Sequence, residues 1–172
     1  MINFPKNFTG LLLNSLPVIL LFFLVISEFQ FTYKNLDYIS FNFIQILIFY
    51  WVLRKPEILG YGFIFLAGIV NDIVIGLPLG ISSIQYLILC GFAAYLRNLT
   101  LRPTLLNDWF AFGPSILITN SIYFLIITSY FSYDVNYVKI LLNTLLTFLL
   151  YPIISFIFNI LSLKISKDGN AS

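Results

Sequence analysis

The sequence predicts an all-α integral membrane protein, a single domain over residues 1–172 built from about six transmembrane helices. Three observations predict this fold class: the composition is apolar, the apolar stretches are about as long as a bilayer is thick, and the basic residues fall mainly on one side of it. Of the 172 residues, 60% are hydrophobic and 9% are charged, whereas soluble domains carry about 25% charged residues. Because so few charges cannot cover a soluble core, we expect lipid to surround the chain.

The apolar stretches have roughly the length of bilayer-spanning helices, which need about 20 mainly apolar residues each. Six such helices with short loops would use nearly the whole chain, so we expect no separate catalytic or ligand-binding domain outside the membrane. The second and fourth stretches are short for a span, so they extend into their flanks or thin the bilayer locally. The expected helices cover residues 10–27, 38–53, 60–77, 81–96, 109–130 and 139–163.

The basic residues predict the orientation, because Lys and Arg stay on the cytoplasmic side of a membrane. With the N-terminus inside, seven of the nine basic residues fall inside and only Lys34 and Lys139 fall outside. Both termini are then cytoplasmic. A re-entrant hairpin over residues 60–96 would satisfy the same asymmetry, so that topology stays open beside full spanning. The basic residues expected inside are Lys6, Arg54, Lys55, Arg97, Arg102, Lys164 and Lys167.

Residue types that catalysis usually needs are scarce. The chain has no His, which is the commonest metal ligand and general base. It also lacks a Gly-x-Ser-x-Gly elbow and a phosphate-binding glycine loop with Lys. The single Cys90 excludes an internal disulfide, and a net charge of +2 is too small to indicate nucleic acid. We therefore expect no enzymatic activity, no catalytic residues, no metal and no cofactor.

One segment carries more specific information than the rest. Gly68, Asp72 and Gly76 are spaced four residues apart and share one face of the third expected helix, and Gly80 extends this row to the turn. Small residues let helices approach closely in lipid. Asp72 is the only acidic residue inside an expected span, where a charge costs about 2.5–3.5 kcal/mol. We expect this face to contact another helix or a partner protein.

Asp72 has one obvious candidate partner. Gln85 is as far from the turn of the expected hairpin as Asp72 is, so its amide could donate to the carboxylate, with Ser82 or Asn71 contributing. Three roles stay open for Asp72: a tie within the hairpin, a contact with another membrane subunit, or binding of an ion, proton or ligand. If it is a simple hydrogen-bonding tie, Asn should replace it well, and Gly68→Leu should be the more damaging change.

Tyr50 and Trp51 end the second expected helix beside the basic residues Arg54 and Lys55. Aromatic rings next to basic side chains are typical of the membrane–water interface, where the amphipathic rings sit at the level of the lipid head groups. We therefore interpret Tyr50 and Trp51 as an interfacial anchor.

In this region the sequence resembles the rod-shape-determining membrane protein MreD family. The resemblance covers about 40 of the 172 residues, and the rest of the chain agrees only in hydropathy. Many family members carry a His or a small residue after the Leu-Gly pair, where this chain has Ile81-Ser82-Ser83. The residues that carry the resemblance are Tyr50-Trp51, Pro56, Gly60, Phe65, Gly68, Asp72, Gly76, Leu79-Gly80 and Tyr86.

The resemblance implies a non-enzymatic, multi-pass subunit of the bacterial inner (cytoplasmic) membrane. Such proteins belong to the cell-elongation complex, or elongasome, which directs lateral peptidoglycan synthesis and so maintains rod shape. The implied partners are an MreC-type bitopic periplasmic protein, a RodA-type glycosyltransferase, a class B penicillin-binding protein and, indirectly, MreB filaments. The implied fold is similar to the substrate-capture subunits (S components) of energy-coupling-factor vitamin transporters.

That similarity of fold leaves an alternative function, a substrate-capture subunit of an energy-coupling-factor type transporter. A capture subunit should present polar or aromatic ligand contacts near the outer face, and small residues on its first helix for docking its partner. The first expected helix here has no Ala-x-x-x-Ala row, which favours the role in cell elongation.

Overall fold

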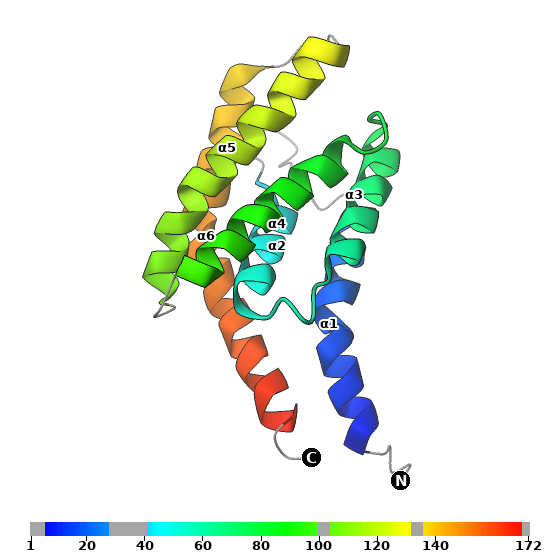
Figure 1. The fold of residues 1–172 in the computed structure, drawn as a ribbon, viewed down its shortest axis with the longest axis vertical. Helices are drawn as coiled ribbons and strands as arrows, with labels where there is room; N and C mark the ends of the chain where they lie inside the picture. The colour runs from blue at the N-terminus through cyan, green and yellow to red at the C-terminus, as the bar shows by residue number, and fades with distance from the viewer. Residues whose placement is uncertain (1–5, 28–40, 100–103, 132–135, 170–172) are drawn as a thin grey trace.

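The computed structural model describes residues 6–27, 41–99, 104–131 and 136–169, and their side chains only within 15–163. Within these ranges the chain forms helices and no strands, which confirms the all-helical prediction. The helices are α1 (Lys6–Ile26), α2 (Phe43–Arg54), α3 (Tyr61–Ile75), α4 (Ile81–Leu99), α5 (Leu105–Phe131) and α6 (Tyr137–Gly169) (Figure 1).

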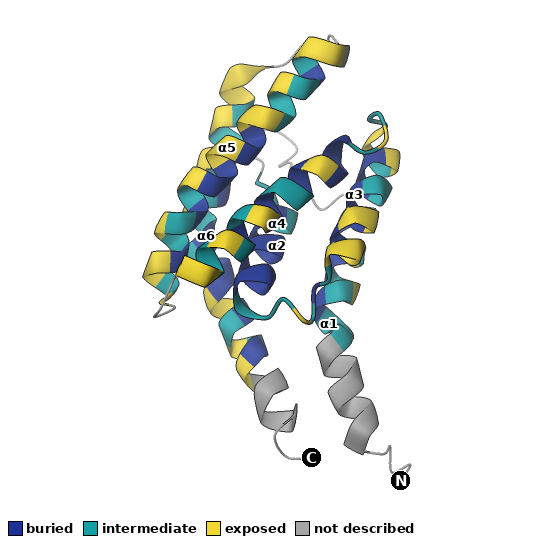
Figure 2. Ribbon diagram, in the orientation of Figure 1, coloured by how far each residue is buried: buried dark blue, intermediate teal, exposed yellow. Residues whose placement is uncertain are grey.

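α2 is the central helix of the bundle. It contacts α1, α4 and α6, and every residue from Gln45 to Leu53 is buried (Figure 2). α3 and α4 form one helical hairpin, and α5 and α6 pack together as a second pair. The start of α1 and the end of α6 lie at the same end of the bundle (Figure 1).

The bounds of α2 follow from its caps. The Asn42 side chain accepts a hydrogen bond from the Gln45 N–H at 3.2 Å, so the helix begins at Phe43. The expected helix 38–53 therefore starts too early where it can be compared, and residues 38–40 lie outside the described residues. With 12 residues, α2 is about 18 Å long. A bilayer core is about 30 Å thick, so α2 is too short to cross it straight.

Within the described residues, two helices are long and apolar enough to cross a membrane: Leu105–Tyr130 in α5 and Tyr137–Leu163 in α6. The apolar helices α2 (Phe43–Arg54) and α3 (Tyr61–Ile75) are shorter than a span. The all-helical fold is thus as predicted, whereas six transmembrane helices are not shown.

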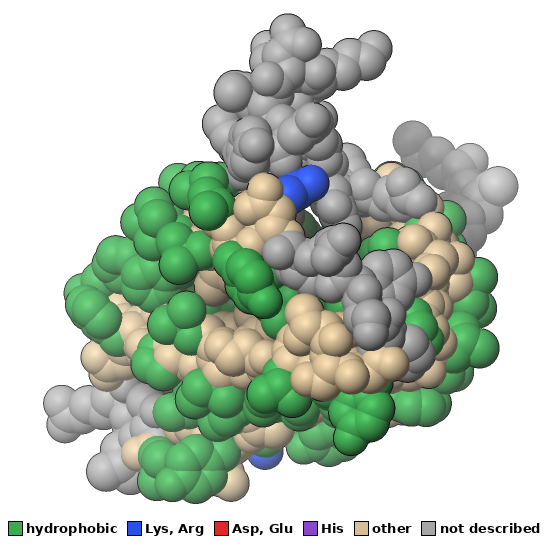
Figure 3. Space-filling view, turned by 90° about the horizontal axis from the view of Figure 1, so that it is seen from above, with side chains coloured by type: hydrophobic (Ala, Val, Ile, Leu, Met, Phe, Trp, Pro, Cys, Tyr) green, Lys and Arg blue, Asp and Glu red, His purple; other side chains and the backbone are tan. Residues whose placement is uncertain are grey.

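The exposed surface of the bundle is strongly apolar. Large hydrophobic side chains are exposed on α1, α3, α4, α5 and α6, among them Phe23, Leu66, Leu125 and Ile153 at 50–62% exposure. Figure 3 shows hydrophobic side chains around the periphery of the bundle when it is seen from above. Soluble monomers rarely expose apolar patches larger than a few hundred Å². A surface of this kind requires a covering of lipid or protein.

Candidate functional site

Asp72 caps the N-terminus of α4. The residue lies in the last turn of α3 and is fully buried. Its Oδ2 accepts a hydrogen bond from the Gly80 N–H at 2.7 Å, and its Oδ1 accepts one from the Ser82 N–H at 3.0 Å. These N–H groups have no partner within their own helix, and the α4 dipole favours a negative charge there. Gly80, which precedes α4, has no side chain for this purpose, so Asp72 replaces one from the neighbouring helix.

The expected bond between Asp72 and Gln85 is therefore wrong. The amide of Gln85 donates to Asn120 on α5, at 3.0 Å. Ser82 does take part, but through its backbone N–H, while its hydroxyl accepts from Asn71 at 2.9 Å. The free N–H groups at the start of α4 lie closer to the turn than Gln85 does. The backbone N–H groups at a helix N-terminus bind a carboxylate without the help of a side chain.

Gly68 lies where the backbones of α3 and α4 pack closely together. A β-carbon at this position would be 2.4 Å from the Ser83 Cα and 2.5 Å from its backbone nitrogen. The Ser83 hydroxyl donates to the Phe65 carbonyl oxygen at 2.9 Å, which joins the two helices at the same level. Since the neighbouring atoms belong to backbone, any residue larger than Gly would push the helices apart.

Gly76 and Gly80 do not extend this contact, contrary to the expectation of a continuous small-residue row. A β-carbon at either position would meet no atom within 4 Å. Gly76 has a φ of +76° and ends α3, and Gly80 has a φ of +100° in the turn before α4. Both glycines therefore provide left-handed backbone conformations for the turn, which other residues adopt at a cost.

Tyr50 and Trp51 do not lie at an interface. Both side chains are 0% exposed and belong to the core. Their rings contact each other, with centroids 5.6 Å apart, and both lie against Phe158 of α6. The interpretation as an anchor is wrong because α2 is surrounded by other helices, so its terminal aromatic residues pack inside the bundle.

A cavity of about 590 Å³ opens at the end of the bundle where α1 and α3 end and α2, α4 and α6 begin. Its polar lining is rich in carboxamide side chains, and no carboxylate lies among the described residues that form it. Figure 3 views this end, where polar side chains and backbone lie inside the hydrophobic periphery. The carboxamides come from α2 and its cap, α3, α4, α5 and α6. They are Asn42, Gln45, Asn71, Gln85, Asn120 and Asn143.

Asn120 is the centre of a buried hydrogen-bond relay in the cavity wall. Its Oδ1 accepts from the Gln45 amide at 2.8 Å and from the Gln85 amide at 3.0 Å. Its Nδ2 donates to the Thr144 hydroxyl at 2.8 Å, and that hydroxyl donates to the Ile140 carbonyl oxygen at 2.9 Å. The relay joins α2, α4, α5 and α6.

The donors and acceptors of this relay can be assigned in only one way, and the assignment shows which polar atoms stay unused. Because the Thr144 hydrogen is used on Ile140, Thr144 can only accept from Asn120. Asn120 must then accept from both glutamines, whose carbonyl oxygens are left over. The Gln45 Oε1 is buried and has no hydrogen-bond partner among the described residues. The sequence indicated Gln85 but neither Gln45 nor Asn120. These three residues lie on different helices and come together only where the helices cross.

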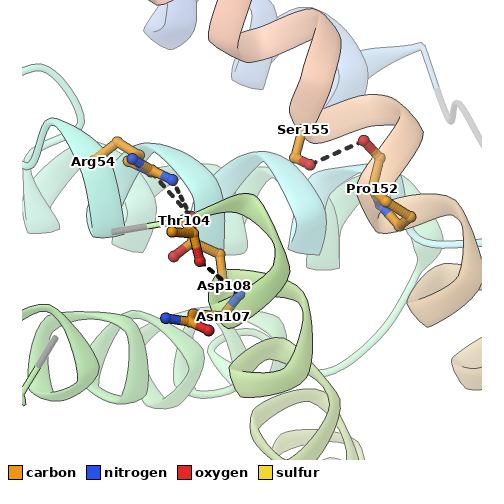
Figure 4. Close-up of polar contacts among 6 residues, drawn as sticks. All are labelled: Arg54, Thr104, Asn107, Asp108, Pro152 and Ser155. Atoms are coloured by element: carbon orange, nitrogen blue, oxygen red, sulfur yellow. Dashed lines mark hydrogen bonds and ion pairs between the residues drawn. The ribbon is translucent and has the colours of Figure 1, made fainter. Parts of the chain in front are cut away.

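A buried ion pair joins α2 to α5. Arg54 Nε donates to Asp108 Oδ2 at 3.0 Å, and a second guanidinium nitrogen reaches the same oxygen (Figure 4). Thr104 precedes α5 and accepts from the Asn107 N–H at 3.3 Å, which starts the helix before Asp108. Asp72 was expected to be the only acidic residue inside a span, and the structure adds Asp108 as a second buried acid in the first turn of α5. The signal was available: Asp108 directly precedes the expected span 109–130.

The described side chains are suited to binding and to holding helices together. Among them, no group of three His, Cys, Asp or Glu residues could hold a metal ion. Carboxamides and hydroxyls are neutral groups that donate and accept hydrogen bonds.

Comparison of the chain with protein-family models, with curated proteins and with solved structures finds no match.

Proposed function

We propose that the chain is a non-enzymatic membrane subunit of the bacterial cell-elongation complex, which maintains rod shape by organising lateral peptidoglycan synthesis. The observation that carries this proposal concerns the residues that resemble the MreD family. Gly68 lies where α3 and α4 pack closely, Asp72 caps α4, and Tyr50 and Trp51 of α2 lie in the core of the bundle. The residues that resemble the MreD family therefore hold the helices together. A subunit that positions other proteins requires such a stable arrangement of helices.

A location in the inner membrane is part of this proposal. It is supported by the apolar surface, by the two helices of spanning length, and by the bias of basic residues toward one side. The start of α1 and the end of α6 lie at one end of the bundle, which agrees with both termini being cytoplasmic. The short helices α2 and α3 would cross a locally thinned bilayer.

The proposed partners come from the resemblance alone. They are an MreC-type bitopic protein and, through it, a RodA-type glycosyltransferase, a class B penicillin-binding protein and MreB filaments. The exposed apolar faces of α5 and α6 offer surface for a transmembrane helix of a partner. Detergent extraction under mild conditions should therefore retrieve an MreC-type protein with the chain.

Depletion of the chain in its own host tests the proposal. Rod-shaped cells should become spherical, and re-expression of the natural chain should restore rods. Gly68→Leu should fail to restore them, because the new side chain meets the Ser83 backbone. The matched control is Gly62→Leu in the same helix, where a β-carbon meets no atom within 4 Å. Cells that keep their rod shape after depletion would overturn the proposal.

A second candidate function is supported by one observation, the polar cavity. Capture of a substrate for an energy-coupling-factor type transporter would require polar and aromatic contacts near the outer face. With cytoplasmic termini, the cavity opens toward that face. Retrieval of a pair of ATPase subunits with the chain, together with loss of uptake of one vitamin on depletion, would favour this function over the first.

A further inference from the structure

We propose that the carboxamide-lined cavity is a binding site for a neutral saccharide, a small molecule with several hydroxyl or amide N–H groups. The inference depends on the cavity and on neither proposed function. Its volume of about 590 Å³ falls in the range of about 300–1,000 Å³ found for sites of small organic ligands. Six elements or their caps contribute to its wall, so a ligand in the open cavity could contact all six helices or their caps.

The cavity offers acceptors that the protein does not use. Gln45 is 1% exposed, lines the cavity, and has a carbonyl oxygen with no partner among the described residues. Gln85 also lines the cavity and uses only its amide nitrogen in the described hydrogen bonds. Buried acceptors are nearly always paired. A ligand that donates hydrogen bonds would pair these oxygens without disturbing the relay through Asn120.

The charge of the lining selects among hydrogen-bond donors. An ammonium group would also donate to carbonyl oxygens, but the part of the lining that the structure describes has no carboxylate to balance it. Among the described residues of the lining, the only ionic group is the exposed Lys139, which would repel a cation. Hydroxyl and amide N–H groups donate without charge, so the ligand should be neutral.

The arrangement of the lining favours a saccharide over a flat heterocycle. Carboxamides project from several walls, whereas a flat heterocycle presents its polar atoms along an edge. A saccharide carries hydroxyl groups around its whole perimeter. It also has apolar C–H faces, for which the cavity provides aromatic side chains. The aromatic residues of the lining are Phe41, Phe43, Tyr86, Tyr123 and Phe124.

The test uses the full chain in detergent and two disaccharides that differ in charge. The probe is N,N′-diacetylchitobiose, which is neutral, and its counterpart is chitobiose, measured below the pKa of its two amines. Calorimetry should show binding of the neutral disaccharide at about 1 mM or tighter, with at least about tenfold weaker binding of the charged one. No binding of the neutral disaccharide at about 10 mM, or tighter binding of the charged one, would overturn the proposal.

Two variants assign the binding to this cavity. Gln85→Leu removes a lining carboxamide and leaves Asn120 its bond from Gln45, and Ile75→Trp narrows the cavity from a residue that is 43% exposed. Each should weaken binding by about tenfold or more, while Asn98→Ala, exposed and outside the lining, should bind as the natural chain does. Because Ile75→Trp removes no buried polar group, it stays informative if Gln85→Leu unfolds. Unchanged binding by a folded Ile75→Trp chain would refute the assignment.

Discussion

The carboxylate of Asp72, in the last turn of α3, accepts a hydrogen bond from the backbone N–H of Ser82, in the first turn of α4, at 3.0 Å. This relationship explains how a fully buried acid is accommodated in an apolar chain. No cation is paired with Asp72 among the described residues. The carboxylate is instead stabilised by the N–H groups at the start of α4, which have no partner within the helix, and by the dipole of α4.

Asp72→Asn should destabilise the protein, contrary to the expectation from the sequence. Both carboxylate oxygens accept hydrogen bonds, from Gly80 and from Ser82. An Asn side chain has one oxygen, so its NH₂ group would face an N–H group. Loss of a cap costs about 0.5–2 kcal/mol. The measurement is the free energy of unfolding in mixed micelles. Equal stability of Asp72→Asn and the natural chain would show that the cap is not important.

Gly68→Ala should destabilise the α3–α4 hairpin by about 1–3 kcal/mol, the usual range for overpacking. The single added methyl group would lie 2.4 Å from the Ser83 Cα, so the helices must separate. Gly62→Ala serves as the control, because its methyl group meets no atom and Ala favours a helix over Gly. Thermal unfolding of both variants checks the prediction. A Gly68→Ala variant as stable as Gly62→Ala would contradict the close contact.

Arg54 and Asp108 should depend on each other for stability. Asp108→Leu removes the carboxylate from beside the partly buried Arg54, and loss of this charge-assisted hydrogen bond should cost about 1.5–3 kcal/mol. Arg54 is 21% exposed and Asp108 is 3% exposed, so Arg54→Leu, which leaves the better buried charge alone, should cost more. A double-mutant cycle measures the coupling. Additive effects of the two substitutions would argue against a stabilising pair.

Reporter fusions should find Ser172 in the cytoplasm and Asn136 outside. Seven of nine basic residues fall inside in this orientation. The fusion partners are an enzyme active only in the periplasm and a fluorescent protein that matures only in the cytoplasm. Periplasmic activity at Ser172, or cytoplasmic fluorescence at Asn136, would exclude this topology. A re-entrant and a fully spanning α3–α4 hairpin both keep their ends on the cytoplasmic side, so these two fusions do not distinguish them. A third fusion at the hairpin tip, after Pro78, does: only a fully spanning hairpin places the tip outside.

The sequence alone determined the all-helical fold and the approximate positions of the helices. Long apolar stretches are local properties of the chain, and a backbone in an apolar environment satisfies its hydrogen bonds within a helix. The same reasoning identified Gly68 and Asp72 as unusual, because a small residue and an acid stand out in any apolar helix.

Only the tertiary structure decided what these residues touch. Whether Asp72 meets Gln85 or the start of α4 depends on how the hairpin turns at Gly76 and Gly80, whose φ values are not a property of composition. Whether Tyr50 lies at a surface or in the core depends on the helices that surround α2. The cavity arises in the same way, because Gln45, Gln85 and Asn120 belong to three helices and meet only where those helices cross.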